Sequence, residues 1–127
     1  MIHGIGTDIV SVKRMQESLD RHGEHFALRI LADNEVEAFR AAASQAGFLA
    51  KRFAVKEAAV KALGTGFRDG ISMKHIYVEH DGLGKPLLKV VGRARELFDE
   101  GGVGECHVTI SDEREYAVAF VTLLKNT

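Results

Sequence analysis

The feature that most constrains the fold of this chain is one long helical segment followed by a pair of glycines. We expect the helix to cover about residues 47–63. The sequence Gly64-Thr65-Gly66 should end it, because glycine readily adopts the left-handed conformation found at helix ends. Ala58, Ala59 and Ala62 give one surface of this helix only small side chains. Such a helix can pack closely against a sheet, so the sequence predicts helix-on-sheet packing.

The same helix carries a pair of opposite charges, Glu57 and Lys61. Residues four apart share a face of a helix, so the carboxylate and the ammonium should lie one turn apart. A hard metal ion binds the carboxylate, and a phosphate binds both the metal and the ammonium. An ordinary surface ion pair has the same spacing, so the pair alone leaves both interpretations open.

The amino-terminal segment Gly4-Ile5-Gly6-Thr7-Asp8-Ile9-Val10 is typical of a short strand. Side chains alternate along a strand, which places Gly4, Gly6 and Asp8 on one side. The two glycines leave space there for another backbone or for a ligand. The segment is not a dinucleotide fingerprint, because Ile9 stands where the third glycine should be. Asp8 is then either a ligand beside that space or a turn or N-cap residue after the strand.

Two further strands are predicted near the carboxyl end. In residues 106–111, Cys106, Val108 and Ile110 should face one way, and His107, Thr109 and Ser111 the other. A turn is expected at 112–114. Residues 116–124 are apolar on both faces, as in a strand at the middle of a sheet, and the two strands should form a hairpin. A single histidine on a strand is commonly structural, so His107 alone does not establish a catalytic role.

Four segments together resemble bacterial holo-acyl-carrier-protein synthases, which are 4'-phosphopantetheinyl transferases. The segments are GIGTDIV (4–10), FLAKRFAVKEAAVKALGTG (48–66), GKP (84–86) and HVTISDEREYA (107–117). They keep the family's order and spacing, and the resemblance runs nearly from end to end. Its most specific part is a strand-borne Asp followed by the Lys-Glu-Ala-x-x-Lys-Ala helix.

The resemblance implies transfer of the 4'-phosphopantetheine arm of coenzyme A to a serine of apo acyl carrier protein. It also implies Mg²⁺ as the cofactor, adenosine 3',5'-bisphosphate as the other product, and a role in fatty acid biosynthesis. The catalytic residues would be Asp8, Glu57, Lys61 and His107, with Asp8 and Glu57 as metal ligands. The residues expected to contact coenzyme A are Lys61, Gly84, Lys85, Pro86, His107 and Ser111.

The chemistry of these residues agrees with that activity. Magnesium usually takes one or two carboxylates together with waters and phosphate oxygens, and a nearby cation neutralises phosphate charge. No side chain in the motifs suggests a covalent nucleophile, which fits direct transfer between two substrates. The sequence leaves three candidates for the general base: Glu57, a metal-activated hydroxide and a carboxylate acting through water.

Basic residues on the early helices form the expected docking surface for acyl carrier protein. Arg14, Ser18, Arg21 and His25 are spaced to share one helical stripe, although stripes of this kind are commonly just solvated. The family's partner is strongly acidic, so complementary charge would guide docking. We expect contacts through Arg14, Arg21 and, if the chain bends gently at Gly23, Arg29. Other basic residues fall within the long helix, at Lys51, Arg52, Lys56 and Lys61.

Length and composition exclude several other classes. With 127 residues, 46% of them hydrophobic and 28% charged, the chain should form one domain over residues 1–127. No apolar stretch has transmembrane length, the amino terminus does not resemble a signal peptide, and a single cysteine allows no internal disulfide. We expect a cytoplasmic protein without a membrane partner. A net charge of −1 gives no general attraction to nucleic acid.

The overall pattern favours an α+β fold, an antiparallel sheet packed by one long helix and several short helices. The resemblance adds a homotrimer with active sites between subunits. Ser11 and Asp33 are the expected N-caps of the first and third short helices. The short helices should cover about 12–21, 24–31, 35–43 and 92–100, and the remaining strands 72–79 and 87–91, around a turn at 81–86.

Two other functions fit some of these features. A different Mg-dependent nucleotide phosphoryl or pyrophosphate enzyme could also use two carboxylates and a lysine. Such enzymes usually gather more acidic residues on one helix than Glu57 alone. A non-enzymatic module that binds acyl carrier protein could use the same basic stripe, but it would not need Asp8, Glu57, Lys61 and His107 together.

Overall fold

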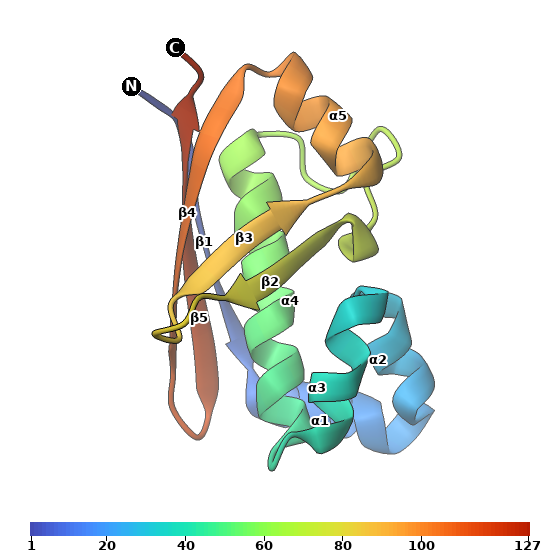
Figure 1. The fold of residues 1–127 in the computed structure, drawn as a ribbon. Coiled ribbons are helices and arrows are strands. Elements are labelled where there is room, and N and C mark those ends of the chain that lie inside the picture. Colours follow the sequence, from blue (N-terminus) through green and yellow to red (C-terminus); the bar gives the residue numbers. More distant parts are fainter.

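The long helix α4 (Gln45–Leu63) lies against a three-stranded antiparallel sheet in this computed structural model, which describes residues 1–127 (Figure 1). The sheet has β5 (Tyr116–Lys125) at its centre, between β1 (Ile2–Ser11) and β4 (Val103–Asp112). A second sheet pairs β2 (Ile76–His80) with β3 (Pro86–Val90), and it contacts α4 through β2 and β4 through β3. The predicted α+β class, the hairpin and the central last strand are confirmed.

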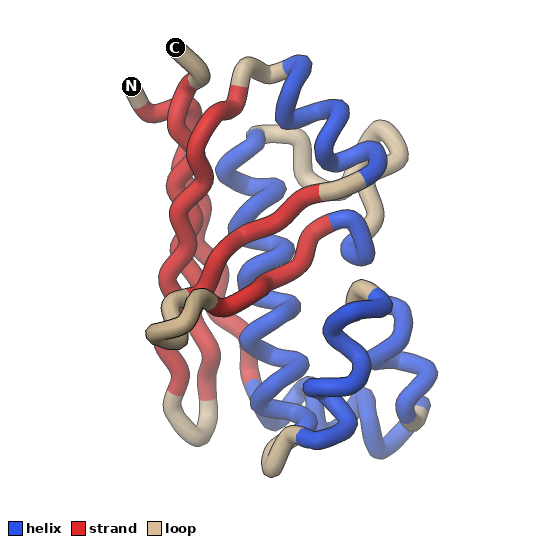
Figure 2. The backbone as a smooth tube through the Cα atoms, in the orientation of Figure 1, coloured by secondary structure: helices blue, strands red, loops and turns tan.

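The short helices lie on the same side of the three-stranded sheet as α4, as Figure 2 shows. Three of them pack around the first half of α4: α1 (Val12–His22), α2 (Glu24–Ile30) and α3 (Val36–Ala41). The last one, α5 (Gly92–Glu100), packs against β4 near the other end of α4 (Figure 1). None of these helices has the length and apolar character needed to cross a bilayer.

Local sequence signals set most helix ends. The Ser11 hydroxyl accepts a hydrogen bond from the Arg14 amide at 3.2 Å, as predicted for an N-cap. Gly64 has a φ of 92° and ends α4, again as predicted. The start of α4 lies two residues earlier than expected, because the Ser44 side chain caps it by accepting from the Gly47 amide.

Two local predictions were wrong. Asp33 does not cap a helix over 35–43, because residues Asp33–Glu35 form a 3₁₀ turn, η1, and α3 covers only Val36–Ala41. The Glu35 side chain turns inward and accepts from the Ala32 amide, which stabilises this turn instead. Residues 72–75 are not strand either. Ser72 caps a second 3₁₀ turn, η2 (Met73–His75), and the strand begins at Ile76.

Two basic residues of α4 are buried rather than part of a solvated face. Lys56 is fully buried, and its Nζ donates to Glu35 Oε1 at 2.8 Å, to the Met73 carbonyl at 2.9 Å and to the Ile76 carbonyl. Arg52 has its Nε 3.4 Å from Glu35 Oε2 and its guanidinium over the Phe48 ring. Burial lowers the pKa of both cations, and the Glu35 charge opposes that change. This cluster joins α4 to η1, η2 and β2.

The contact between β1 and α4 is close enough to require glycine. A Cβ at Gly4 would lie 1.9 Å from the Ala62 carbonyl oxygen, and one at Gly6 would lie 2.1 Å from the Ala58 carbonyl oxygen. The space predicted beside the two glycines is therefore filled by the helix backbone. Asp8 follows on the same face of β1, so this contact brings its side chain to the surface of α4.

We predict that Gly6→Ala lowers the free energy of unfolding by about 1–3 kcal/mol, because the added methyl must push α4 away from β1. Urea denaturation measures the loss. The control is Gly82→Ala in the β2–β3 turn, where no atom lies within 4 Å of the new Cβ. Equal stability of the two variants would show that the strand and helix do not depend on this close approach.

Candidate active site

The structure brings Asp8 and Lys61 into direct contact. Lys61, in the last turn of α4, places its Nζ 3.0 Å from Asp8 Oδ1 and 3.1 Å from the Thr7 carbonyl oxygen. Asp8 lies within β1 and faces the helix, so the alternative role as a cap or turn residue is excluded. The Asp8 side chain is 17% exposed and that of Lys61 is 52% exposed. The pair therefore lies at the rim of the interface between strand and helix.

Glu57 lies one helical turn before Lys61 and close to Asp8. Burial raises the pKa of Glu57, the negative charge of Asp8 raises it further, and the positive charge of Lys61 acts in the opposite direction. Lys61 makes its ion pair with Asp8 and none with Glu57. The simple i,i+4 surface pair that the spacing also allowed is therefore not formed, and the Glu57 carboxylate has no cation in contact.

The two carboxylates line the same hollow, which has a volume of about 610 Å³. Arg14 of α1 lines it as well, so a residue predicted for partner docking lies beside the carboxylates. Much of the wall is apolar, which explains why burial affects Glu57. The lining residues are Asp8, Ile9, Val10, Ser11, Arg14, Met15, Phe53, Glu57 and Tyr116.

This donor set fits magnesium better than a transition metal. No group of three or more His, Cys, Asp or Glu side chains is placed to hold an ion by itself. Asp8 and Glu57 offer two carboxylates beside an open hollow. Magnesium is commonly held in this way, because it retains waters and takes substrate phosphates as further ligands.

His107 and Ser111 lie on the opposite face of the sheet from Asp8. Paired residues in a sheet point to the same side, and His107 is in register with Thr122 and Ile5, whereas Asp8 is in register with Ala119 and Ile110. The His107 ring is about half exposed and lies 3.1 Å from the Glu105 carboxylate. The predicted alternation along β4 is confirmed, but within one chain His107 does not reach the carboxylates.

Gly84 and Lys85 lie in the predicted turn between β2 and β3, and Pro86 is the first residue of β3. Asp81 Oδ1 accepts from the Leu83 and Lys85 amides at 2.9 Å each, and these bonds lower the pKa of the Asp81 carboxyl. Gly84 has a φ of 86°. The Lys85 side chain is exposed, and the turn does not line the hollow that holds Asp8 and Glu57.

The basic residues predicted for docking are exposed on α1 and α2. Gly23 has a φ of 70° and separates α1 from α2, as the predicted helix bounds require, so the condition of a gentle bend, on which the place of Arg29 in the stripe depended, is not met. Arg29 nevertheless shares a small hollow with residues of the predicted stripe. That hollow also contains His22, which does not belong to the predicted stripe. Its lining residues, none of which is acidic, are Ser18, His22, His25, Phe26 and Arg29. We call it the basic hollow.

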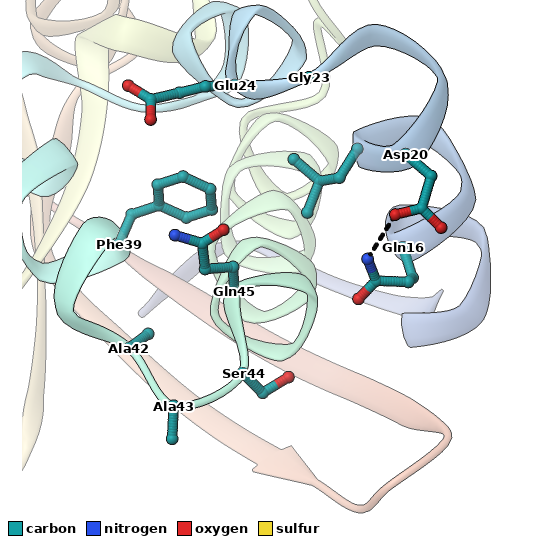
Figure 3. Close-up of a pocket in the computed structure, with 10 residues that line it drawn as sticks. Gln16, Asp20, Gly23, Glu24, Phe39, Ala42, Ala43, Ser44 and Gln45 are labelled. Carbon is teal, nitrogen blue, oxygen red and sulfur yellow. Dashed lines mark hydrogen bonds between the residues drawn. The ribbon is translucent and has the colours of Figure 1, made fainter.

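The nearby acidic residues line a different hollow, shown in Figure 3. Asp20 accepts a hydrogen bond from the Gln16 side chain at 2.9 Å, and Glu24 is paired with Arg40. The two hollows share no residue. Asp20 and Glu24 therefore do not line the basic hollow of α1 and α2.

The outer face of the sheet carries large exposed apolar side chains beside His107 and Ser111. Ile5 and Ile9 on β1 are 58% and 63% exposed, and Tyr116 and Phe120 on β5 are 50% and 41% exposed. Apolar side chains grouped on one face commonly mark a binding surface. The sheet is therefore covered by α4 on one face and presents an apolar surface on the other.

Comparison with known proteins gives consistent results. The family model described as 4'-phosphopantetheinyl transferase superfamily matches residues 4–121. The holo-[acyl-carrier-protein] synthase of Halorhodospira halophila is 56% identical over 124 residues, 98% of each chain. The crystal structure of the synthase from Neisseria meningitidis has a TM-score of 0.93 at 42% identity, covering 98% of this chain and 100% of that one. The synthase of Bacillus anthracis in complex with CoA (3',5'-ADP) has a TM-score of 0.81 at 36% identity, with coverage of 100% and 99%.

Proposed function

The chain belongs to the 4'-phosphopantetheinyl transferase superfamily, and we propose that it acts through Asp8, Glu57 and Lys61. It transfers the 4'-phosphopantetheine arm of coenzyme A to a serine of apo acyl carrier protein, the activity for which its relatives are named. The observation that carries the site assignment is the contact of Lys61 with Asp8 beside Glu57 in one hollow. The cytoplasmic location, which rests on composition, and the role in fatty acid biosynthesis, which rests on the resemblance, both stay predictions.

Asp8 and Glu57 would hold Mg²⁺, which supplies charge neutralisation on the pyrophosphate when bound. Lys61 contributes a further positive charge from the same helix face and contacts a phosphate of coenzyme A. The candidate general bases stay Glu57, a metal-activated hydroxide and a carboxylate acting through water; the raised pKa of Glu57 belongs to the metal-free chain, because a bound cation would lower it.

We predict that Asp8→Asn and Glu57→Gln each lose most transfer activity while folding normally. Lys61→Met should lower turnover roughly a hundredfold, because one donor to developing charge is worth about 3 kcal/mol. The assay mixes the protein with coenzyme A, Mg²⁺ and apo carrier, and mass spectrometry detects the added phosphopantetheine arm. Lys125→Met, an exposed lysine at the end of β5, is the control and should retain activity.

The same assay separates the alternatives. Nucleotide release without modification of the carrier would indicate a different phosphoryl enzyme, and binding of the carrier alone would indicate a docking module. Wild-type turnover in any of the three site variants would remove that residue from the proposed site.

We further propose a homotrimer whose active sites lie between subunits. Two features support it: the exposed apolar outer face of the sheet, and the position of His107 and Ser111 on that face. Because these two residues lie on the opposite sheet face from Asp8 in their own chain, their proposed role in the site would require them to complete the site of a neighbouring copy. Coenzyme A would then bind between subunits, with Gly84, Lys85 and Pro86 as additional contacts.

We predict that Phe120→Asp breaks the trimer and removes most transfer activity, because it places a charge in the centre of the outer face. Sedimentation should give the mass of three chains for the wild type and one chain for the variant. Leu83→Asp is the matched control, since Leu83 is 98% exposed in the β2–β3 turn. A Phe120→Asp protein that keeps both mass and activity would place the interface elsewhere.

Acyl carrier protein is proposed to dock on α1 and α2 through Arg14, Arg21 and Arg29. Arg14 lines the hollow of the carboxylates, and Arg29 lines the basic hollow with Ser18, His22 and His25. A surface that extends from these arginines to the hollow of Asp8 and Glu57 fits an acidic partner whose serine must reach those two carboxylates.

We predict that Arg14→Glu combined with Arg21→Glu raises KM for the carrier roughly tenfold and leaves KM for coenzyme A unchanged. Single substitutions should have smaller effects, because exposed pairs are worth about 0.2–1 kcal/mol each. Steady-state kinetics at several salt concentrations measure both values, and the wild-type dependence on salt should weaken in the variant. The control, Arg95→Glu with Lys125→Glu, makes the same change in net charge on another surface. A carrier KM that moves equally in both double variants would show only a general charge effect.

A further inference from the structure

We infer that Lys61 serves as an internal counter-cation for Asp8, which it holds in the unloaded enzyme and releases when Asp8 ligates the metal. The release would free Lys61 for the pyrophosphate of coenzyme A. Lys61 would thereby couple the binding of the metal to the binding of coenzyme A. The inference rests on the roles proposed above for Asp8 and Lys61. It concerns the order in which Asp8 binds the metal and Lys61 binds coenzyme A.

The contact that supports this inference is specific. Lys61 Nζ donates to two acceptors on β1, the Asp8 carboxylate at 3.0 Å and the Thr7 carbonyl at 3.1 Å. A Cβ at Gly6 would lie 3.0 Å from the Lys61 Cβ, so the base of the lysine side chain lies directly on the strand. Lys61 is thus held against Asp8 by the packing of α4 on β1.

The same carboxylate cannot serve both cations equally well. A divalent ion on Asp8 would repel an ammonium group in contact with that side chain. Asp8 is short, mostly buried and fixed on a strand, whereas Lys61 has a flexible four-carbon stem and is half exposed. A partly exposed ion pair is also weak enough to exchange. Lys61 is therefore the residue that moves.

Two consequences follow from this exchange. The Lys61–Asp8 pair lowers the affinity for metal alone, because the metal must compete with an ammonium group already in place. Metal binding raises the affinity for coenzyme A beyond direct metal–phosphate contact, because the released Lys61 becomes available. Linkage requires that coenzyme A raise the affinity for the metal by the same factor.

The test measures Mg²⁺ binding by calorimetry in the absence of coenzyme A. Lys61→Met should bind Mg²⁺ roughly tenfold more tightly than the wild type, because the competing cation is gone. Arg14→Gln is the matched control: Arg14 lines the same hollow but has no ion pair with Asp8, so its removal should change the affinity much less. Nitrogen-15 NMR of the lysine ammonium groups should show the Lys61 signal shifting on addition of Mg²⁺ to the wild type.

A second measurement compares coenzyme A affinity with and without Mg²⁺. The gain due to Mg²⁺ should be smaller in Lys61→Met than in the wild type. The inference is overturned if Lys61→Met binds Mg²⁺ no more tightly than the wild type, or if Arg14→Gln tightens binding equally. Asp8→Asn tests the proposed ligand separately, since unchanged Mg²⁺ affinity there would contradict the metal assignment itself. Loss of Mg²⁺ binding in Asp8→Asn with no tightening in Lys61→Met would contradict only the exchange.

Discussion

The backbone contact between β1 and α4 is the constraint on which the candidate site depends. Gly4 and Gly6 let the strand approach the Ala58 and Ala62 carbonyls more closely than any side chain would permit. At this separation Asp8 meets Lys61 and lies beside Glu57. A methyl group added at Gly4 or Gly6 would push β1 away from α4 and separate Asp8 from the side chains of the helix, since protein interiors transmit such strain rather than absorb it.

A second constraint fixes α4 from its other side. Lys56 and Glu57 are adjacent in sequence, yet Lys56 points into the core and Glu57 into the hollow, because successive helix residues are rotated by about 100°. The Lys56–Glu35 pair and the two carbonyls it reaches hold η1, η2 and β2 on the helix. Breaking a buried pair by removing one partner costs about 3–5 kcal/mol, so this cluster opposes rotation of α4. One short motif therefore contributes both an anchor and a site residue.

The sheet separates the site residues into two groups. Its inner face presents Asp8 to α4, and its outer face presents His107 and Ser111 among exposed apolar side chains. A site that needs both groups is incomplete in one chain. The proposed assembly resolves this, because the surface that would bury Ile5, Ile9 and Phe120 is the surface that carries His107. Burial of apolar area and completion of the site would then occur together.

The sequence by itself determined the elements with strong local signals: the long helix ended by Gly64, the Ser11 cap and the alternation along β1 and β4. The family resemblance grouped Asp8 with Glu57 and Lys61, whereas the two glycines by themselves left room for either another backbone or a ligand on that side. Only the tertiary structure decided that Glu35 and Lys56 are buried, since the sequence indicated no environment for Glu35 and favoured a solvated face for Lys56. A lysine in a helix is ordinarily solvated, and its burial requires partners from distant segments that the local sequence does not reveal. The face of His107 relative to Asp8 was likewise decided by strand pairing, because the register between β1, β5 and β4 is set by packing on α4 and not by alternation within one strand.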